Sequence, residues 1–276
     1  MKTHNLYCGT SPLLISVPHA GTFVPPDIKR RLSTPAIKLP DTDWHQEQIY
    51  YEMHEELGAS LLAATHSRYV VDLNRSPEDE DLYPGQVKTG LVPLETFAGE
   101  KIYLPGEDPD AIEHSNRVTA YWYPYHDALA AALARLQEEF GFALLYDGPS
   151  ICSHLPRSFD GTLQDLNIGT ARGESCAPDL AECFYGALQD QGYSSVLNGR
   201  FVGGFITRNY GKPAEGVHAI QMELTWKNYM KKEAAPYHYD ADKAAKLSAV
   251  LQNALAQLIR FAGERFARPE LSLHKD

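Results

Sequence analysis

Residues 13–19 read Leu-Leu-Ile-Ser-Val-Pro-His, and runs of this kind decide the fold class of the chain. Five mostly apolar residues ended by a proline predict a short buried strand. Comparable apolar runs occur at 142–146 (FALLY) and 217–224 (VHAIQMEL). Helical patterns separate these runs, and they predict helices over 43–57, 112–140, 179–191 and 240–265. Strands that alternate with helices indicate an α/β protein, with a sheet covered by helices on both faces.

The remaining segments are predicted to contain further strands, one break in a helix and two irregular regions. Further strands are predicted over 60–65, 68–73 and 194–197. The long helical region is interrupted near Pro124, since proline cannot donate a backbone hydrogen bond. The polar segments 76–106 and 150–173 show no clear period, and the length of the first is typical of a functional or lid-like loop. Because no repeat or break in composition divides residues 1–276, we predict a single domain.

Composition narrows the class of protein. The chain has 276 residues, is 43% hydrophobic and carries a formal net charge of −11. An acidic protein is not drawn to phosphate backbones, so we expect no nucleic-acid partner. No run approaches the roughly 18 apolar residues of a membrane span, and we expect a cytoplasmic protein with no membrane association. The four cysteines are scattered without a CxxC pair and are expected to be free thiols: Cys8, Cys152, Cys176 and Cys183.

Several polar residues stand where chemistry is expected. His19 follows a predicted strand, and the carboxyl ends of such strands face the crevice in which α/β proteins bind ligands; the alternative is a loop histidine with a structural hydrogen bond. Asp41 and Asp43 lie at the start of a predicted helix, where the helix dipole stabilises carboxylates or where one of them ligates a metal ion. His126, inside a helix, is more often structural than catalytic.

Two further groups suit an anionic substrate and a proton transfer. Arg75, next to Asn74, can fork a carboxylate, or it pairs with Asp72. Glu223 lies inside an apolar strand, where desolvation raises the pKa of a carboxyl group towards the range of a general base. The structural alternative for Glu223 is a salt bridge with Arg200 or Arg208. Residues 165–170 are predicted to form a polar turn.

Taken in order, these segments and others resemble the N-formylglutamate deformylase family over almost the whole chain. The resemblance is carried by LPDTDWH (39–45), SRYVVDLNR (67–75), LYPGQ (82–86), YWYPYH (121–126), LPRSFDGTLQDLNIGT (155–170), GGFITRNYGKP (203–213), VHAIQMEL (217–224) and NYM (228–230). The family is similar in fold to zinc carboxypeptidases and aspartoacylase. The resemblance therefore implies a mixed central sheet flanked by helices, with one zinc ion at the strand ends.

The resemblance also implies a reaction, the hydrolysis of N-formyl-L-glutamate, or of a closely related N-acyl amino acid, in histidine degradation. The products are formate and L-glutamate, zinc activates the water, and Glu223 is the general base. His19 and Asp43 match the first two zinc ligands, with Asp41 as the alternative to Asp43. The substrate carboxylates are assigned to Asn74, Arg75, Arg200 and Arg208.

One segment departs from the family pattern. The family usually reads Asp-x-His-Ser at a strand end, and its histidine completes the zinc site, but residues 147–150 here read Asp-Gly-Pro-Ser. Pro149 offers no ligand atom, whereas a catalytic zinc normally has three protein ligands. Three interpretations stay open: His154 or Cys152 substitutes as a ligand; two ligands hold the metal weakly; or the protein only binds an acidic amino-acid derivative.

Overall fold

The strands form one mixed sheet in the computed structural model, which describes residues 2–78 and 89–267. Their order across the sheet is β1-β3-β2-β4-β8-β6-β7, and β5 pairs with β8 beside this path. The strands are β1 (His4–Tyr7), β2 (Leu13–Val17), β3 (Ser60–Ala64), β4 (Ala143–Asp147), β5 (Ser150–Ile151), β6 (Leu166–Gly169), β7 (Ser195–Leu197) and β8 (Val217–Thr225).

The centre of the sheet is parallel and its flanks are partly antiparallel. Strands β3, β2, β4 and β8 run parallel to one another, whereas β1 is antiparallel to β3 and β6 is antiparallel to β8. Every residue of the four central strands is buried, as expected for parallel strands that are covered on both faces. The mixed central sheet that the resemblance implied is therefore confirmed.

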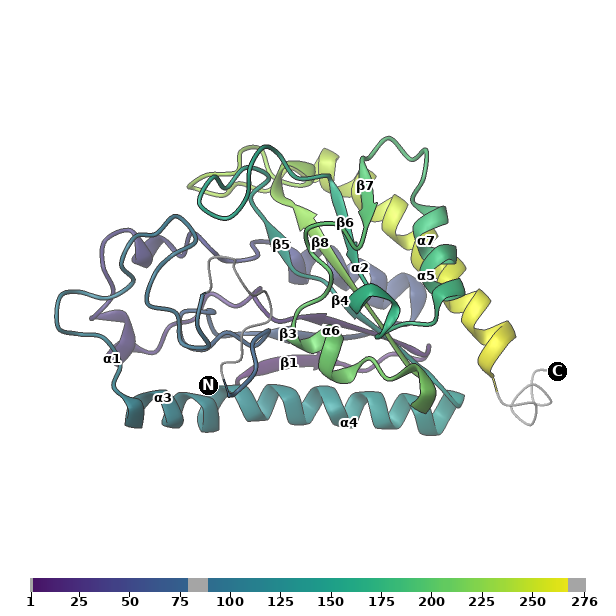
Figure 1. Cartoon of the computed structure of the whole chain (residues 1–276), viewed down its shortest axis with the longest axis horizontal. Helices are drawn as coiled ribbons and strands as arrows, with labels where there is room; N and C mark the ends of the chain where they lie inside the picture. Colours follow the sequence, from purple (N-terminus) through teal and green to yellow (C-terminus); the bar gives the residue numbers. More distant parts are fainter. Residues whose placement is uncertain (1, 79–88, 268–276) are drawn as a thin grey trace.

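Helices cover both faces of this sheet (Figure 1). Helices α2, α5 and α7 pack on one face, and α4 and α6 pack on the other. The helices are α1 (Pro26–Lys29), α2 (Gln46–Leu57), α3 (Ala111–Arg117), α4 (Tyr123–Phe140), α5 (Pro178–Ala187), α6 (Phe205–Tyr210) and α7 (Ala241–Phe266). The shorter turns are η1 (Ala36–Lys38), the π-helical turn η2 (Val118–Trp122), η3 (Ala171–Gly173), η4 (Pro213–Glu215) and η5 (Trp226–Asn228).

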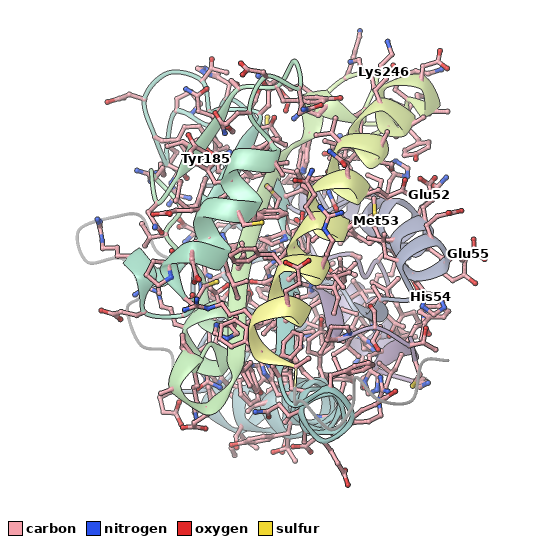
Figure 2. All side chains as sticks on the ribbon, turned by 90° about the vertical axis from the view of Figure 1, so that its right-hand side faces the viewer. Glu52, Met53, His54, Glu55, Tyr185 and Lys246 are labelled. Carbon is pink, nitrogen blue, oxygen red and sulfur yellow. The ribbon has the colours of Figure 1, made fainter. Side chains whose placement is uncertain are left out.

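The outer layer shows why these segments are helical. In α7, Leu247, Leu251, Leu255 and Leu258 are buried at spacings of three and four, which forms an apolar stripe, and the side chain of Asp240 caps the helix by accepting from the Lys243 amide. Figure 2 shows this layer, with Met53 of α2 between α2 and α7, and with Glu52, Glu55 and Lys246 pointing outward. The stripe fixes α7 against α2 and α5.

Two predicted elements were wrong. Residues 68–73 form turns rather than a strand, because a buried ion pair between Arg68 and Asp72 closes this segment on itself over four residues. Residues 165–170 are not a turn, since Leu166–Gly169 is strand β6, with Leu166 and Ile168 buried between β7 and β8. Both predictions came from hydrophobic pattern alone, whereas an ion pair over four residues decides the first segment and pairing with strands β7 and β8 decides the second.

Other segments follow the predictions more closely. The predicted break near Pro124 is the π-helical turn η2, which ends just before the first turn of α4. Part of the 76–106 loop lies outside the described residues, so its role as a lid stays a prediction, as does the single domain. None of the described helices combines the length and apolarity that a membrane-spanning helix requires.

Candidate active site

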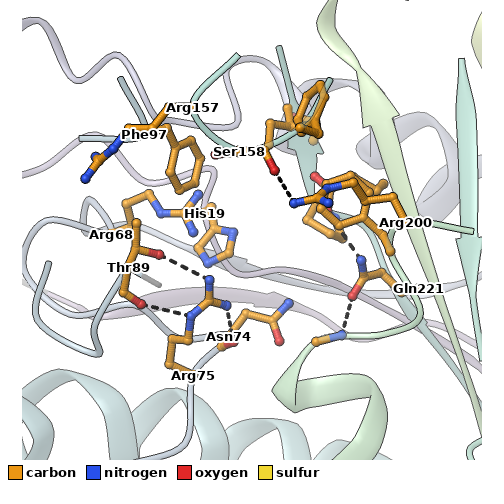
Figure 3. Close-up of a pocket in the computed structure, with 17 residues that line it drawn as sticks. His19, Arg68, Asn74, Arg75, Thr89, Phe97, Arg157, Ser158, Arg200 and Gln221 are labelled. Atoms are coloured by element: carbon orange, nitrogen blue, oxygen red, sulfur yellow. Dashed lines mark hydrogen bonds between the residues drawn. The ribbon is translucent and has the colours of Figure 1, made fainter. Parts of the chain in front are cut away.

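Three central strands end at the same edge of the sheet, and a pocket lies there (Figure 3). His19 follows β2, Pro149 and Ser150 follow β4, and Glu223 lies near the end of β8. The remaining lining residues include four arginines and three phenylalanines: Arg68, Asn74, Arg75, Thr89, Phe97, Ile151, Arg157, Ser158, Phe159, Arg200, Phe201, Gly204 and Gln221. Because parallel strands share their carboxyl edge, residues far apart in the chain meet at this place.

Buried polar side chains hold His19 in place. Its Nε2 lies 2.7 Å from Oδ1 of Asp72, and the other oxygen of Asp72 accepts from Arg68 at 2.6 Å. Its Nδ1 lies 3.4 Å from Oδ2 of Asp43. Since the carboxylate of Asp72 accepts the proton on Nε2, it orients the ring and turns Nδ1 towards Asp43.

The charges of these buried groups shift the pKa values of Asp72 and His19. Burial would raise the pKa of Asp72, but Arg68 and His19 outweigh it and hold the pKa well below its usual range. Burial and Arg68 lower the pKa of His19, but Asp72 and Asp43 outweigh them and raise it. Asp72 therefore stays ionised beside His19.

The structure separates the roles of Asp41 and Asp43. Oδ2 of Asp41 accepts from the Tyr69 hydroxyl at 2.7 Å and from the Phe97 amide at 2.9 Å, so this oxygen is committed to structural hydrogen bonds. Oδ2 of Asp43 faces His19 and accepts from the Ser150 amide at 2.9 Å. The arrangement favours Asp43 over Asp41 as the partner of His19.

Glu223 and Asp147 are buried carboxyl groups with raised pKa values. Burial, with the Asp43 carboxylate, raises the pKa of Glu223 to about 8. Burial raises the pKa of Asp147 to about 7, against a hydrogen bond that Asn74 donates at 2.8 Å. Among the described residues Glu223 forms no ion pair, so the structural alternative of a bridge to Arg200 or Arg208 is not observed. Its Oε2 accepts from Nε2 of Gln221 at 3.3 Å.

A prediction follows for stability. With a pKa of about 8 in the folded protein and about 4.3 in the unfolded chain, Glu223 loses its proton on unfolding between these pH values, so it destabilises the protein increasingly as pH rises. Glu223→Gln is expected to stabilise the metal-free protein by ~2–4 kcal/mol at pH 8 and by less at pH 5. Urea unfolding at both pH values, with the exposed Glu215→Gln as control, measures the difference; an equal effect at both would contradict the assigned pKa.

The four arginines of the pocket differ in their partners. Arg68 pairs with Asp72, and Arg157 pairs with Glu95. Within the described ranges, neither Arg75 nor Arg200 forms an ion pair. Figure 3 shows their guanidinium groups separated from each other, on different parts of the pocket wall.

Local contacts fix these two arginines without neutralising them. Arg75 donates to the carbonyl and hydroxyl of Thr89, each at 3.2 Å, so the alternative of a pair with Asp72 is not observed. Arg200 donates to the Ser158 carbonyl and lies over the Phe159 ring, and its Nε is a buried donor for which the described residues provide no acceptor. Two half-buried cations remain for an anionic ligand.

Other predicted site residues lie elsewhere. Arg208 is exposed, donates to the Gly203 carbonyl, and does not line the pocket. His154 is exposed, with its Nδ1 2.9 Å from the Gly161 carbonyl, and Cys152 donates to the His154 carbonyl at 3.4 Å. Neither lines the pocket, so the structure does not bring a substitute ligand to the place of Pro149.

The pocket also contains residues that the sequence pattern does not predict to be part of a site. Arg68 falls within the predicted strand 68–73, although its spacing of four from Asp72 also fits a turn closed by an ion pair. Gln221 lies two residues before Glu223 in β8, and alternation places both side chains on one face. Arg157 and Phe97 lie in irregular segments, where no local pattern indicates which way a side chain points.

Two buried donor atoms of the site fit a metal ion. Among the described residues, Nδ1 of His19 and Oδ1 of Asp43 are buried atoms without a hydrogen-bond partner, and buried polar atoms are nearly always satisfied. A divalent cation between them would satisfy both. The described part of the chain contains no group of three or more His, Cys, Asp or Glu residues arranged for a metal ion. The residues therefore fit a cation held by two side chains, His19 and Asp43.

Known proteins with similar sequences belong to one enzyme family. The model of the N-formylglutamate amidohydrolase family matches residues 11–230. The N-formylglutamate deformylase of Pseudomonas putida is 46% identical over 97% of this chain and 99% of its own length. The N-formylglutamate deformylase of Pseudomonas aeruginosa is 49% identical over 94% of this chain and 97% of its own length.

Solved structures share the fold. The crystal structure of N-formylglutamate amidohydrolase from Ralstonia eutropha has a TM-score of 0.82 at 24% identity, and the match covers 96% of this chain and 99% of that chain. The crystal structure of a gene product from Agrobacterium tumefaciens has a TM-score of 0.71 at 17% identity and covers 95% of each chain. At these identities the likeness establishes the arrangement of strands and helices.

Proposed function

Because the chain belongs to the N-formylglutamate amidohydrolase family, we propose that it hydrolyses N-formyl-L-glutamate to formate and L-glutamate. The observation that carries the proposal is one pocket in which Glu223 lies with His19 and with two arginines that lack a carboxylate partner among the described residues. The pocket thus combines a base with cationic groups for a dicarboxylate substrate.

His19 and Asp43 are the residues that would hold a metal ion, which we expect to be zinc. Their buried, unpartnered Nδ1 and Oδ1 support this assignment, and Asp72 fixes the tautomer of His19 that leaves Nδ1 free. A bound zinc ion would supply polarisation of the formyl oxygen and a lowered pKa of the attacking water.

Glu223 moves the proton in this proposal. Its carboxylate accepts a proton from the attacking water and then gives it to the amide nitrogen, so that the C–N bond breaks and glutamate leaves as the amine. The raised pKa supports this role, since a base with a pKa near the working pH both accepts and returns a proton. Gln221 holds the carboxylate in place through its amide, whose oxygen is fixed at 2.5 Å by the Gly204 N–H.

Arg75 and Arg200 bind the two carboxylates of the substrate. We assign the α-carboxylate to Arg75, with Asn74 beside it, and the side-chain carboxylate to Arg200. The planar guanidinium groups match carboxylates, and their half-burial strengthens the interaction relative to a fully hydrated pair. Phe97, Phe159 and Phe201 provide an apolar wall around these charges.

The deciding experiment is a formate-release assay. Purified protein is incubated with N-formyl-L-glutamate after removal of metal by a chelator, and again after addition of zinc. Formate release that depends on the added metal is expected. No formate with zinc, or equal formate with and without a chelator, would contradict the metal-dependent hydrolysis.

Substrate selectivity tests the role of Arg200. N-formyl-L-glutamine has the same shape as the substrate but lacks the side-chain carboxylate, so the protein is expected to prefer N-formyl-L-glutamate. Arg200→Ala should lower kcat/KM for N-formyl-L-glutamate by roughly 10- to 100-fold and should leave that for N-formyl-L-glutamine nearly unchanged, since it removes a charge-assisted hydrogen bond. The exposed Arg208→Ala is the matched control. Equal losses on both substrates would contradict the assignment.

Pro149 favours a second candidate function, a binding protein that uses the same pocket without turnover. It predicts that N-formyl-L-glutamate raises the melting temperature of the protein while no formate is released. A melting temperature that no N-acyl amino acid changes would count against this candidate.

The hydrolase proposal also carries a cellular context. We place the reaction in histidine degradation in the cytoplasm, where the resemblance to the family places it. Growth of a deletion strain on histidine, with and without the gene restored, tests this context.

A further inference from the structure

The backbone around Asn74 is held by side chains instead of by a sheet or a helix. Three consecutive carbonyl groups each accept a side-chain N–H: that of Leu73 from His126 Nε2 at 2.9 Å, that of Asn74 from Arg75 Nη1 at 3.0 Å, and that of Arg75 from Trp122 Nε1 at 3.0 Å. Buried carbonyl groups need partners, and these donors supply them in a segment that belongs to no strand or helix. The conformation of this segment therefore depends on Trp122 and His126.

Trp122 and His126 form one rigid unit. Their rings stack with centroids 3.7 Å apart and an angle of 20° between the planes. Trp122 is the last residue of the π-helical turn η2, and His126 lies in the first turns of α4. Such π-helical turns inside a helix are rare and occur frequently at functional sites. Here the turn joins two helical segments at the point where the two stacked donors reach carbonyls two residues apart.

Helix α6 fixes the same unit from the other side. Since a carbonyl only accepts, the bond to Leu73 places the proton of His126 on Nε2, and Nδ1 accepts from the Tyr210 hydroxyl at 3.0 Å. Burial lowers the pKa of His126 to about 4, which keeps this ring neutral at pH 7. The amide of Ile206, also in α6, donates to Oδ1 of Asn74 at 2.9 Å. Helix α6 therefore holds both His126 and the Asn74 side chain in place.

We propose that Trp122 and His126 are positioning residues for the carboxylate-binding pair Asn74–Arg75. Neither lines the pocket, whereas both residues of the pair do. The two stacked rings donate hydrogen bonds to the carbonyls of Leu73 and Arg75, on either side of Asn74. These bonds fix the backbone so that the Arg75 guanidinium and the Asn74 amide face the α-carboxylate. The inference rests on the proposed function, because it assigns the α-carboxylate to Arg75.

The test compares variants of η2 and of the helix α4 that follows it. Trp122→Phe keeps the stacked ring and removes the N–H; His126→Leu removes both; His126→Gln retains an amide N–H in the place of Nε2. Tyr125→Phe is the matched control, because this buried hydroxyl on the same helix donates to the Leu62 carbonyl in β3 and not to the Asn74 segment. Formate release is measured with N-formyl-L-glutamate and with its α-amide, which lacks the α-carboxylate.

Trp122→Phe and His126→Leu are expected to raise KM for N-formyl-L-glutamate about five- to tenfold, the effect of losing one neutral hydrogen bond, with kcat within about twofold. KM for the α-amide should not change, His126→Gln should recover part of the loss, and Tyr125→Phe should lower the melting temperature without raising KM. If Trp122→Phe and His126→Leu behave like Tyr125→Phe, or raise KM equally for both substrates, the proposal is wrong.

A readout without turnover separates this inference from the proposed function. If the wild type releases no formate, the proposed function fails, and hydrogen exchange at the Asn74 and Arg75 amides then decides the inference. Faster exchange in Trp122→Phe than in Tyr125→Phe supports the positioning role of Trp122 and His126, and equal exchange overturns it.

Discussion

Replacing Glu223 by glutamine is expected to lower kcat for formate release by roughly 10²- to 10⁴-fold, the usual contribution of a positioned general acid–base group. Glutamine keeps the size of the side chain and its contact with Gln221, but it cannot accept a proton from water. KM should change little, because Arg75 and Arg200 hold the substrate and remain in place. Steady-state kinetics of the zinc-loaded variant measures both values.

The matched control is Glu215→Gln, an exposed carboxylate just before the same strand. It should leave kcat unchanged. A Glu223→Gln variant that retains full kcat would remove Glu223 from the proton transfer. A variant that has lost activity together with its cooperative unfolding would instead be a misfolded protein; the expected gain in stability at pH 8 distinguishes these cases.

Pro149→His is expected to tighten zinc binding by more than the roughly 100-fold that an outer-shell partner can contribute, since it adds a direct ligand. Pro149 lines the pocket with His19, and the next residue, Ser150, donates its amide to Asp43, so we expect a histidine at 149 to reach the two unpartnered donor atoms. Competition with a chelating dye measures the dissociation constant. Turnover should rise in parallel if a weakly held metal limits the hydrolysis.

Pro149→Leu is the control, because it removes the proline ring without adding a ligand atom. It should not tighten zinc binding. If Pro149→His and Pro149→Leu bind zinc equally, residue 149 does not face the metal, and the interpretation of Pro149 as a missing ligand is wrong. If Pro149→His tightens zinc binding without raising turnover, the second candidate function, binding without hydrolysis, gains support.

Residues 68–73 illustrate where local pattern fails. The β-branched residues Val70 and Val71 favour a strand, and both are buried as in a strand. However, Arg68 and Asp72 also had to be buried, and burying each charge required the other within reach. The turn satisfies that requirement, and it places Asp72 against His19. The chemistry of the ion pair overrode the β-propensity of its neighbours.

The sequence by itself determined the alternation of strands and helices, the position of His19 at a strand end and the burial of Glu223 within a strand, because hydrophobic periodicity and strand ends are local properties. Only the tertiary structure places Asp43 and not Asp41 against His19, leaves His154 and Arg208 outside the pocket, and brings Arg68, Arg157 and Gln221 into it. Two bonds of the site join residues that are far apart in the sequence, 53 positions for His19 and Asp72 and 107 for Asp43 and Ser150. Contacts between residues so far apart depend on which strands become neighbours in the sheet. A local sequence pattern does not indicate which strands these are.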